Sequence, residues 1–533
     1  MVHRLEEKFL KYHTFASPAK ICIVICISLV LTILSMYIIF TSIIPKKSST
    51  PIQEIFIESK KRAHFRTSSK FLSVTLDSFV IAMGFKNFNT TNMKLIRMMQ
   101  YLSPGYLRVG GTLADKLYFS TSDQINENVQ NFYETMYDEG LNNYNIPNYT
   151  MTDLQWLQLT KLAENAGLEI FFDLNSLIRF RNGSWDYRNA RNLIEFSNYH
   201  KLKVNWELGN EPNSFEHKFN EVVNATQMAR DFALLRKILN KYPFYKNSLL
   251  IGPDVTRPQK NHKESELYLE EFLQNSVNTI NAITWHQYYI NGRTAQAQDF
   301  LNPKIFDYLK HQIKDVKEIV KSSPNRKADV YLGETSSAYG GGAPNLSDSF
   351  IGSFIWADKL GLAAKMGVRV VMRQSIFHGN YALLDNNYDP NPDWWLSVLH
   401  KKLIGEVVVP YHTITSPYVR LYVYCTKRAL FERRNNSITI MGMNLVDNVA
   451  KIRINGLLSD HFEAPSEVYS FELTSEALQS KSVLLNGKPL KMLPNNTLPI
   501  FVPVLKRLTP FVTMSPQSIA FWVIPNTNVM ACL

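Results

Sequence analysis

From residue 71 onward, short apolar runs alternate with longer segments in which apolar residues recur every three to four positions. The short runs are typical of buried strands and the longer period of amphipathic helices. The predicted strands lie at 71–77, 105–111, 168–175, 203–210, 248–254, 282–289, 329–335 and 368–374. Helical patterns between them include 92–102, 152–167, 228–242 and 305–323. Eight strands separated by helices predict an α/β fold, a parallel (β/α)8 TIM barrel over 71–400.

The helical period fades near residue 401, and alternating strands follow at 418–429, 437–445 and 517–525. This pattern predicts a C-terminal β-sandwich over 401–533. Residues 45–70 form a polar, basic stem whose "EIFIES" is a candidate strand for that sandwich. Residues 119–148 are acidic, rich in amides and poor in pattern, which indicates an exposed insertion in the barrel.

Several predicted barrel strands end in a polar residue. In barrels of this type the loops after the strands carry the active site. A closed barrel would therefore bring these strand ends into one ring, which consists of Asp77, Asn175, Glu211, Asp254, His286, Glu334 and Gln374.

The stretch "VNWELGNEPNSF" at 204–215 holds two carboxylates with different predicted roles. Glu207 alternates with apolar residues inside the strand, and we expect a structural residue paired with a basic neighbour on the outer side of its strand. Glu211 follows the break at Gly209, and so belongs to the loop at the barrel mouth. Burial beside Trp206 or another aromatic would raise the pKa of Glu211, as acid catalysis near neutrality requires.

Glu211 and Glu334 end the fourth and seventh predicted strands. Retaining hydrolysis of a glycosidic bond needs a carboxylate nucleophile and a carboxylic acid roughly 5 Å apart, which strands across a barrel can supply. Either glutamate alone could instead cap a helix, and only the pair favours catalysis. Asn210, next to the acid, is placed to bind a sugar hydroxyl near the reacting carbon.

Other candidates keep two interpretations. His286 is either a core histidine or a hydrogen-bond partner of the nucleophile. The glycines at 340–342 offer bare amides to an anion or form a plain flexible loop. Arg257, Lys260 and Lys263 form either a solvated basic loop or a contact for sulfate or carboxylate.

The N-terminal region predicts a membrane anchor. Residues 21–44 are uncharged and long enough to cross a bilayer, and they exceed the apolar core of a cleavable signal peptide. Residues 1–20 would then be cytoplasmic and the remainder lumenal or extracellular, as in a type II membrane protein. Seven N-x-[ST] sequons beyond the anchor suit that orientation, and begin at Asn89, Asn148, Asn182, Asn224, Asn345, Asn435 and Asn495.

Charge and cysteine content narrow the function further. The formal net charge of +12 suggests an acidic partner, although a plain solvated basic surface is the alternative. The basic residues are dispersed without a nucleic-acid-binding signature, so we expect no nucleic-acid partner. Of the four cysteines, Cys425 and Cys532 are the pair beyond the anchor, which fits one disulfide in an oxidising compartment. The histidine and cysteine spacings predict no metal site, and we expect no cofactor.

A family resemblance rests on "WELGNEPNSF", "GPDV", "TWHQYYINGRTA", "LGETSSAYGGGAP", "KLGLAAKMGVRVVMRQ" and "GKPLKMLPNNTLP". In this order, they closely resemble the heparanases, the endo-β-glucuronidases of heparan sulfate in glycoside hydrolase family 79. The resemblance runs from about residue 71 to residue 533. It implies a barrel and sandwich, retaining hydrolysis of internal glucuronic acid–glucosamine linkages, Glu211 as proton donor, Glu334 as nucleophile and a Cys425–Cys532 disulfide. The implied substrate-binding residues are Asp77, Thr112, Asn210, Arg257, Lys260, His286, Arg293, Tyr339, Gly340, Gly341, Gln374, Gly379 and Tyr381.

The chain departs from that family in several places. The resemblance implies excision of a linker to give a two-chain form, but 119–148 is shorter and lacks an evident basic cleavage region, so a single chain is the alternative. "NYTMTD" replaces a basic cluster, Gln259 an arginine, and Phe79 a polar contact near Asp77. We expect a glycosidase of heparan sulfate proteoglycans that is membrane-anchored, or lysosomal or secreted if clipped. The alternatives are a heparan-sulfate-binding protein without catalysis and an exo-β-glucuronidase.

Overall fold

The computed structural model describes most of the chain after the N-terminal region. The described residues are 51–121, 129, 132–133, 146–427, 436–457 and 467–533, together with Ser17, Ala19, Cys22 and 27–36. They fall into two units, residues 1–51 and 52–533. Most of the insertion at 119–148 lies outside the described residues, between the paired strands β5 (Leu117–Ser120) and β6 (Tyr149–Thr152).

The predicted membrane anchor gains no support. Of residues 21–44, the structure describes Cys22 and 27–36, and the rest of that prediction lies outside the described residues. Among the helices of the described residues, none combines the length and the apolar character that crossing a membrane requires.

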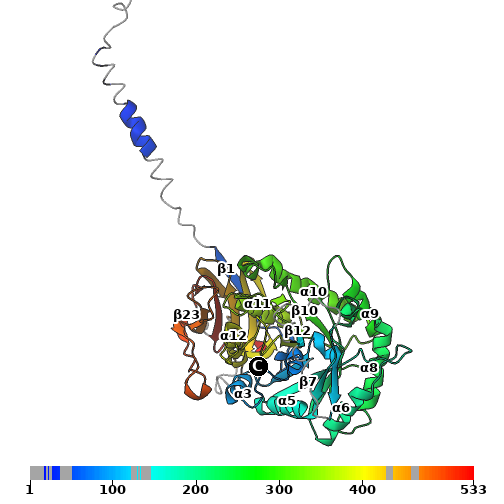
Figure 1. The fold of residues 1–533 in the computed structure, drawn as a ribbon. Coiled ribbons are helices and arrows are strands. Elements are labelled where there is room, and N and C mark those ends of the chain that lie inside the picture. Colours follow the sequence, from blue (N-terminus) through cyan, green and yellow to red (C-terminus); the bar gives the residue numbers. More distant parts are fainter. Residues whose placement is uncertain are drawn as a thin grey trace, which may run out of the picture. The chain divides into compact units, whose positions relative to one another are not determined.

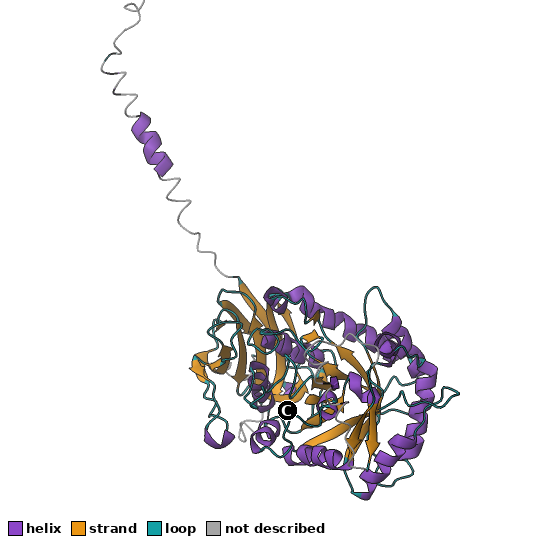
Figure 2. Ribbon diagram, in the orientation of Figure 1, coloured by secondary structure: helices purple, strands orange, loops and turns teal. Residues whose placement is uncertain are grey.

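Eight parallel strands form the central sheet of the larger unit, ringed by helices (Figures 1 and 2). Each strand except β8 pairs with the next along the chain, and the last, β14, pairs with the first, β3. A parallel bridge between Trp206 and Leu250 joins the two edge strands, so the sheet nearly closes into the expected barrel. The strands are β3 (Leu72–Asp77), β4 (Gly105–Gly110), β7 (Leu168–Leu174), β8 (Val204–Leu208), β9 (Ile251–Val255), β10 (Ala282–Gln287), β12 (Asp329–Thr335) and β14 (Val370–Arg373).

Capping residues at both ends of a barrel helix show how the local sequence sets the bounds of a helix. In α5, Thr152 and Gln155 form a capping box at the first turn, and Gly167 ends the helix with a left-handed φ of 67°. The helices that follow the barrel strands are α3 (Met93–Gln100), α5 (Asp153–Ala166), α6 (Arg188–Tyr199), α8 (Ala225–Leu239), α9 (Glu264–Asn275), α10 (Pro303–Ser322), α11 (Gly352–Lys365) and α12 (Pro392–Leu403).

Two further sheets form the C-terminal β region. The smaller sheet has the order β16-β1-β19-β24. Strand β1 contains 54–57 of the predicted stem segment "EIFIES", and it pairs in parallel with β19 and antiparallel with β16. The larger has the order β2-β15-β17-β18-β25-β20-β21-β22, with β23 on β20. The bounds are β1 (Ile52–Ile57), β2 (Phe65–Arg66), β15 (Ile404–Val408), β16 (Tyr411–Ile414), β17 (Val419–Thr426), β18 (Ile438–Asn444), β19 (Ala450–Asn455), β20 (Glu467–Thr474), β21 (Leu484–Leu485), β22 (Lys488–Pro489), β23 (Val504–Arg507), β24 (Val512–Met514) and β25 (Ser518–Ile524).

Helix α11 joins the barrel to this β region. The buried Asp358 accepts hydrogen bonds from the Tyr422 hydroxyl and the Arg420 Nε, both from β17. A Cβ at Gly361 would lie 2.1 Å from the Tyr422 ring, so this contact requires glycine. Close packing and a buried ion pair therefore fix the β region against the barrel.

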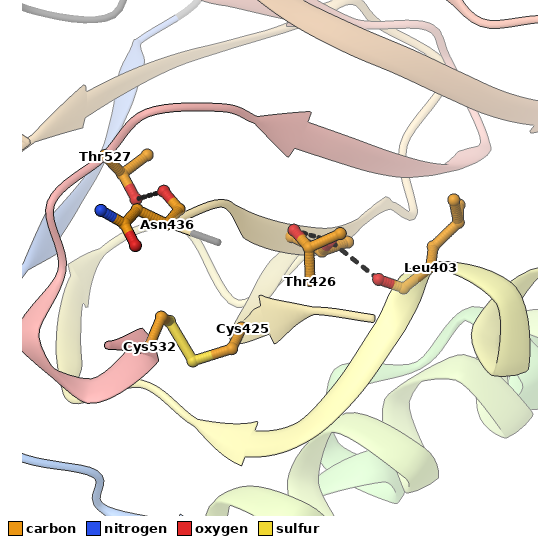
Figure 3. Close-up of a disulfide and its surroundings, with 7 residues drawn as sticks. Leu403, Cys425, Thr426, Asn436, Thr527 and Cys532 are labelled. Atoms are coloured by element: carbon orange, nitrogen blue, oxygen red, sulfur yellow. Dashed lines mark hydrogen bonds between the residues drawn. A yellow bond between two sulfur atoms is a disulfide. The ribbon is translucent and has the colours of Figure 1, made fainter. Parts of the chain in front are cut away.

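The predicted disulfide is present, joining Cys425 of β17 to Cys532 beside the C-terminus (Figure 3). Both cysteines are buried. The bond ties the end of the chain to an interior strand of the larger sheet.

Replacing Cys425 and Cys532 together by serine should lower the free energy of unfolding. The bond closes a loop across 107 positions of sequence, for which the chain-entropy model gives about 4–5 kcal/mol. Denaturant unfolding of the double variant would measure the loss, with Cys22→Ser, at an exposed free cysteine, as the control. An unchanged unfolding midpoint would contradict this prediction.

Candidate active site

A cleft of about 900 Å³ opens at the carboxyl ends of the barrel strands. It collects most of the residues that the sequence selected, which come from widely separated parts of the chain. The predicted residues that line it are Asp77, Thr112, Glu211, Arg257, His286, Arg293, Glu334, Tyr339, Gly340, Gly341, Gln374, Gly379 and Tyr381. Asn210 and Lys260 are not among its lining residues: Asn210 is buried below it, and Lys260 is exposed outside it.

A left-handed turn presents Glu211 at the end of β8. Its φ and ψ are 56° and 57°, a sparsely populated conformation for a residue with a side chain. Neighbouring carbonyl and carboxylate groups hold this turn, because Glu211 N donates to Asp254 O at 3.1 Å and Asn210 N donates to Asp115 Oδ2 at 2.8 Å. The strand end is therefore fixed by contacts with residues far away in the sequence.

Two nitrogen groups contact the carboxylate of Glu211. Lys218 Nζ lies 2.5 Å from Oε2, and His286 Nδ1 lies 3.0 Å from Oε1. Burial raises the pKa of Glu211, but the Lys218 ammonium and the His286 ring outweigh it and hold that pKa well below its usual range. The predicted rise in the pKa of Glu211 is therefore wrong. Trp206, the aromatic named in that prediction, packs edge-on against Tyr245 at 5.5 Å.

Glu334 ends β12 and accepts hydrogen bonds on both carboxylate oxygens. The Tyr288 hydroxyl donates to Oε1 at 2.6 Å, and Arg108 Nη1 donates to Oε2 at 3.0 Å. Its side chain is 10% exposed, so it reaches the cleft from a mostly buried position. The two donors fix the orientation of the carboxylate, as attack by a nucleophilic oxygen requires.

Below the cleft, the fully buried Arg108 of β4 is surrounded by acids from other strands. Its Nε donates to Glu207 Oε2 at 2.6 Å, and its Nη2 donates to Asp254 Oδ2 at 2.9 Å and lies 3.6 Å from Asp173 Oδ2. Glu207 thus has the expected basic partner, but the predicted outer orientation was wrong. Its side chain points into the barrel, toward the guanidinium that also contacts Glu334.

Asp173, Glu207 and Asp254 also have the spacing of a cation site. One carboxylate oxygen from each lies within 4.8 Å of the others. Both Asp173 oxygens, Glu207 Oε1 and Asp254 Oδ1 are buried without hydrogen-bond partners. Burial and, for Asp173, the neighbouring Asp115 raise the pKa of Glu207 and of Asp173 well above their usual range. Protons on these acids and the Arg108 charge together offset the negative charge of the cluster.

His286 connects this buried cluster to the cleft. Its Nε2 lies 3.6 Å from Asp254 Oδ1, while its Nδ1 contacts Glu211. Of its two interpretations, the ring is buried as in a core histidine, whereas the hydrogen bond joins it to Glu211, the predicted acid, and the interpretation as a partner of the nucleophile is wrong. Burial lowers the pKa of His286, but the charges of Glu334, Asp254 and Glu211 raise it to about 9. The ring is therefore cationic at neutral pH.

Asp77 and the last strand form another wall of the cleft. Asp77 accepts hydrogen bonds from Phe79 N and Gln374 Nε2, each at 2.9 Å. Burial, with a smaller effect of Glu334, raises the pKa of Asp77 to about 6. Gly111 has a φ of 104°, and a Cβ there would lie 2.9 Å from Asp77 Oδ2. Glycine therefore leaves room for this carboxyl group.

Cationic and glycine-rich loops complete the rim. Arg257 lies over the Tyr339 ring at 5.1 Å from its centroid and donates from Nη1 to Tyr288 O at 3.0 Å. Gly340 and Gly341 have positive φ values, and a Cβ at either would meet open space. Their backbone is therefore open to an approaching ligand.

Reasoning from the sequence missed Arg108, Tyr288 and Lys218. An arginine inside the apolar strand "GYLRVGG" was a signal for a buried ion pair. Tyr288 stands two positions after His286, at the end of the same strand segment. The sequence gives no comparable signal for Lys218, since only folding brings it back to Glu211.

A nearly closed (β/α)8 barrel with strand-end glutamates on one cleft is an arrangement found in glycoside hydrolases. Residues 79–361 match the family model "Glycosyl hydrolase family 79, N-terminal domain". The chain is 35% identical to heparanase of Bos taurus, over 87% of this chain and 90% of that protein. It is therefore a glycoside hydrolase and belongs to family 79, within the heparanase group.

The chain is also similar to proteins that are named for a different activity or for the lack of one. The chain is 31% identical to inactive heparanase-2 of Homo sapiens, over 87% of each. It is 32% identical to hyaluronoglucuronidase of Hirudo nipponia, over 87% of this chain and 96% of that protein. The fold is similar to a crystal structure of a 4-O-α-L-rhamnosyl-β-D-glucuronidase from Fusarium oxysporum, with a TM-score of 0.65, 15% identity and coverage of 88% of this chain and all of that one.

Replacing Arg108 by methionine should destabilise the protein by at least about 3–5 kcal/mol, because removing one partner leaves buried charges without compensation. Denaturant unfolding would measure this loss. Arg188→Met removes an ion pair with Asp186 in which the arginine is 67% exposed, and should lower the stability far less, because solvent screens an exposed pair. Similar losses in the two variants would refute the buried-cluster interpretation.

The charge on His286 should make stability depend on pH. Its folded pKa of about 9 exceeds the ordinary value near 6.5, so its contribution is complete below pH 6.5 and is lost as pH rises through 9. His286→Gln should therefore flatten the decline in unfolding free energy between pH 6.5 and 9, which is worth about 3 kcal/mol. His311→Gln, at an exposed position, is the control. A wild-type curve that stays flat over this range would contradict the assignment.

Proposed function

We propose that this chain is a retaining endo-β-glucuronidase that hydrolyses internal glucuronic acid–glucosamine linkages of heparan sulfate. Glu334 is the nucleophile and Glu211 the proton donor, both carried by the barrel of residues 71–400. One observation carries the proposal: the two strand-end glutamates line the same cleft in different settings. Tyr288 and Arg108 hold the two oxygens of Glu334 in place, whereas Glu211 lies between His286 and Lys218.

In the first step, a Glu334 oxygen attacks the anomeric carbon while the bond to the leaving oxygen breaks. Glu211 donates its proton to that leaving oxygen. The product is a glycosyl ester of Glu334, and the released chain leaves with a free hydroxyl. In the second step, Glu211 takes a proton from water, which attacks the anomeric carbon and frees Glu334. Tyr288 and Arg108 orient the nucleophile throughout.

Charge and similarity together favour an acidic polysaccharide as the substrate. Lys218, Arg257 and Arg293 line the cleft, and cations at a cleft attract carboxylates and sulfates. The similarity to heparanases favours heparan sulfate as that polysaccharide. Hyaluronan is the second candidate, because the chain also resembles a hyaluronoglucuronidase. Product sizing on both polymers distinguishes these substrates, and shortened chains rather than released monosaccharide distinguish endo from exo cleavage.

The disulfide bears on where the protein is located. The Cys425–Cys532 disulfide supports a compartment that oxidises thiols, so we place the enzyme outside the cell or in lysosomes. Intact mass of the purified protein after deglycosylation would show whether the N-terminal segment or the 119–148 insertion is removed.

Alanine variants should separate the two catalytic roles. With an aryl β-glucuronide that has a good leaving group, Glu211→Ala should keep the first step and, with added azide, yield the β-glycosyl azide. Glu334→Ala should lose at least about 10³-fold in kcat, and azide should give the α-anomer, because the covalent intermediate is bypassed. NMR of the products would identify the anomers. The same anomer from both variants would overturn the assignment.

The binding-only alternative has its own test, which the similarity to an inactive relative makes necessary. Glu334→Gln preserves the shape of the side chain and should keep heparan sulfate binding while abolishing chain shortening. If wild type and variant both bind and neither shortens the chain across pH 4 to 7, the binding-only interpretation replaces the proposed one.

A further inference from the structure

The predicted proton donor has cationic partners on both of its oxygens. Lys218 Nζ is 2.5 Å from Glu211 Oε2, and His286 Nδ1 is 3.0 Å from Oε1. A general acid must carry a proton on one of these oxygens. Each contact places a positive charge beside an oxygen, which disfavours a proton there. Loss of one of the two contacts would therefore make Glu211 a better proton acceptor and allow it to act as an acid.

His286 is the partner that stays in place. It belongs to a barrel strand, its side chain is 1% exposed, and its second ring nitrogen faces Asp254 at 3.6 Å. Moving the ring would leave a buried cation without its carboxylate neighbours, which is costly.

Lys218 is the partner that can move. It belongs to α7 (Phe215–Phe219), a short helix at the rim, and its side chain is 18% exposed and lines the cleft. Within the part of the chain that the structure describes, its one ion pair is with Glu211. Its flexible four-carbon stem can turn the ammonium toward a ligand while the helix stays fixed.

The other charged and titratable groups near this pair come from several elements. Asp115 acts electrostatically on Lys218 from below, and His217 shares the rim. The remaining groups that face Glu211 or its partners are Asp254 of β9, Arg257 after it, Tyr288 after β10 and Glu334 of β12. None of these described groups replaces the Lys218 contact on Glu211 Oε2.

We propose that Lys218 exchanges Glu211 for an anionic group of the bound sugar, and that this exchange frees Glu211 to take a proton from solvent and act as the acid. The inference rests on the proposed function and adds a substrate requirement to it. A ligand without a suitably placed anion leaves Lys218 on Glu211 and the acid deprotonated. The anion is either a glucosamine sulfate or a glucuronate carboxylate.

The pKa of Glu211 supports this exchange. The Lys218 ammonium is the largest influence that lowers it. When that cation moves to a substrate anion, only His286 still opposes the effect of burial, so the pKa of Glu211 rises. Binding of the anion and protonation of the acid are therefore coupled.

The test compares Lys218→Met with wild type on heparan sulfate and on heparosan, the unsulfated polymer with the same backbone. If sulfate is the exchanged anion, the ratio of kcat/KM on heparan sulfate to kcat/KM on heparosan should fall at least tenfold in the variant. If carboxylate is exchanged, activity on both polymers falls by a similar factor. In either case the basic limb of the pH profile, where kcat/KM falls as pH rises, should move to higher pH by at least one unit. This limb reports the free enzyme.

Two further variants make the test specific. Lys161→Met removes an exposed lysine that pairs with Glu164 on α5, and should change neither the preference nor the pH limb. Lys218→Arg keeps the charge, and its basic limb should lie within half a pH unit of that of the wild type. This variant also tests the proposal if Lys218→Met does not fold. A role in folding alone, or in binding alone, would not move the limb.

The outcomes are distinguishable. A wild-type protein that cleaves neither polymer overturns the proposed function and this inference with it. A wild type that cleaves, beside a Lys218→Met variant whose pH limb does not move, overturns only the exchange by Lys218.

Discussion

One buried guanidinium organises the interior of this barrel. Arg108 extends from β4 and contacts carboxylates from β7, β8, β9 and β12, together with the Asn210 amide at the end of β8. Five strands of the nearly closed sheet therefore share one charge. Since a buried charge is tolerated only with well-placed partners, these contacts constrain where the strands lie relative to one another. The same constraint fixes Glu334.

Above this cluster, the two glutamates of the cleft differ because their neighbours differ. Glu334 is held by a tyrosine and the buried arginine, both from the barrel interior. Glu211 is held by a strand histidine and by a lysine from a rim helix. In the proposed mechanism the nucleophile needs fixed geometry and the proton donor needs a variable proton affinity, and the buried partners of Glu334 and the partly exposed Lys218 beside Glu211 suit these needs. The left-handed turn at Glu211 places its carboxylate between His286 and Lys218.

The sequence predicted the fold well and the site in part. The eight strands and the disulfide are confirmed, because hydrophobic period and cysteine pairing are local or countable properties. Of the predicted ring of polar strand ends, five line the cleft, whereas Asn175 and Asp254 do not. The predicted orientation of Glu207, the expected hydrogen bond of His286 to the nucleophile and the predicted rise in the pKa of Glu211 were wrong. Alternation along a strand that is buried on both faces does not show which face a polar residue occupies.

The sequence by itself determined the order of strands and helices, the position of each strand end, and which polar residues follow those ends. Only the tertiary structure decided which of these residues touch. Lys218 lies on α7, Tyr288 follows β10 and Arg108 lies on β4. Together they give the two glutamates different hydrogen bonds and charged neighbours. The reason is physical: pKa values and hydrogen bonds depend on distances of a few ångströms, and these arise only when the barrel closes.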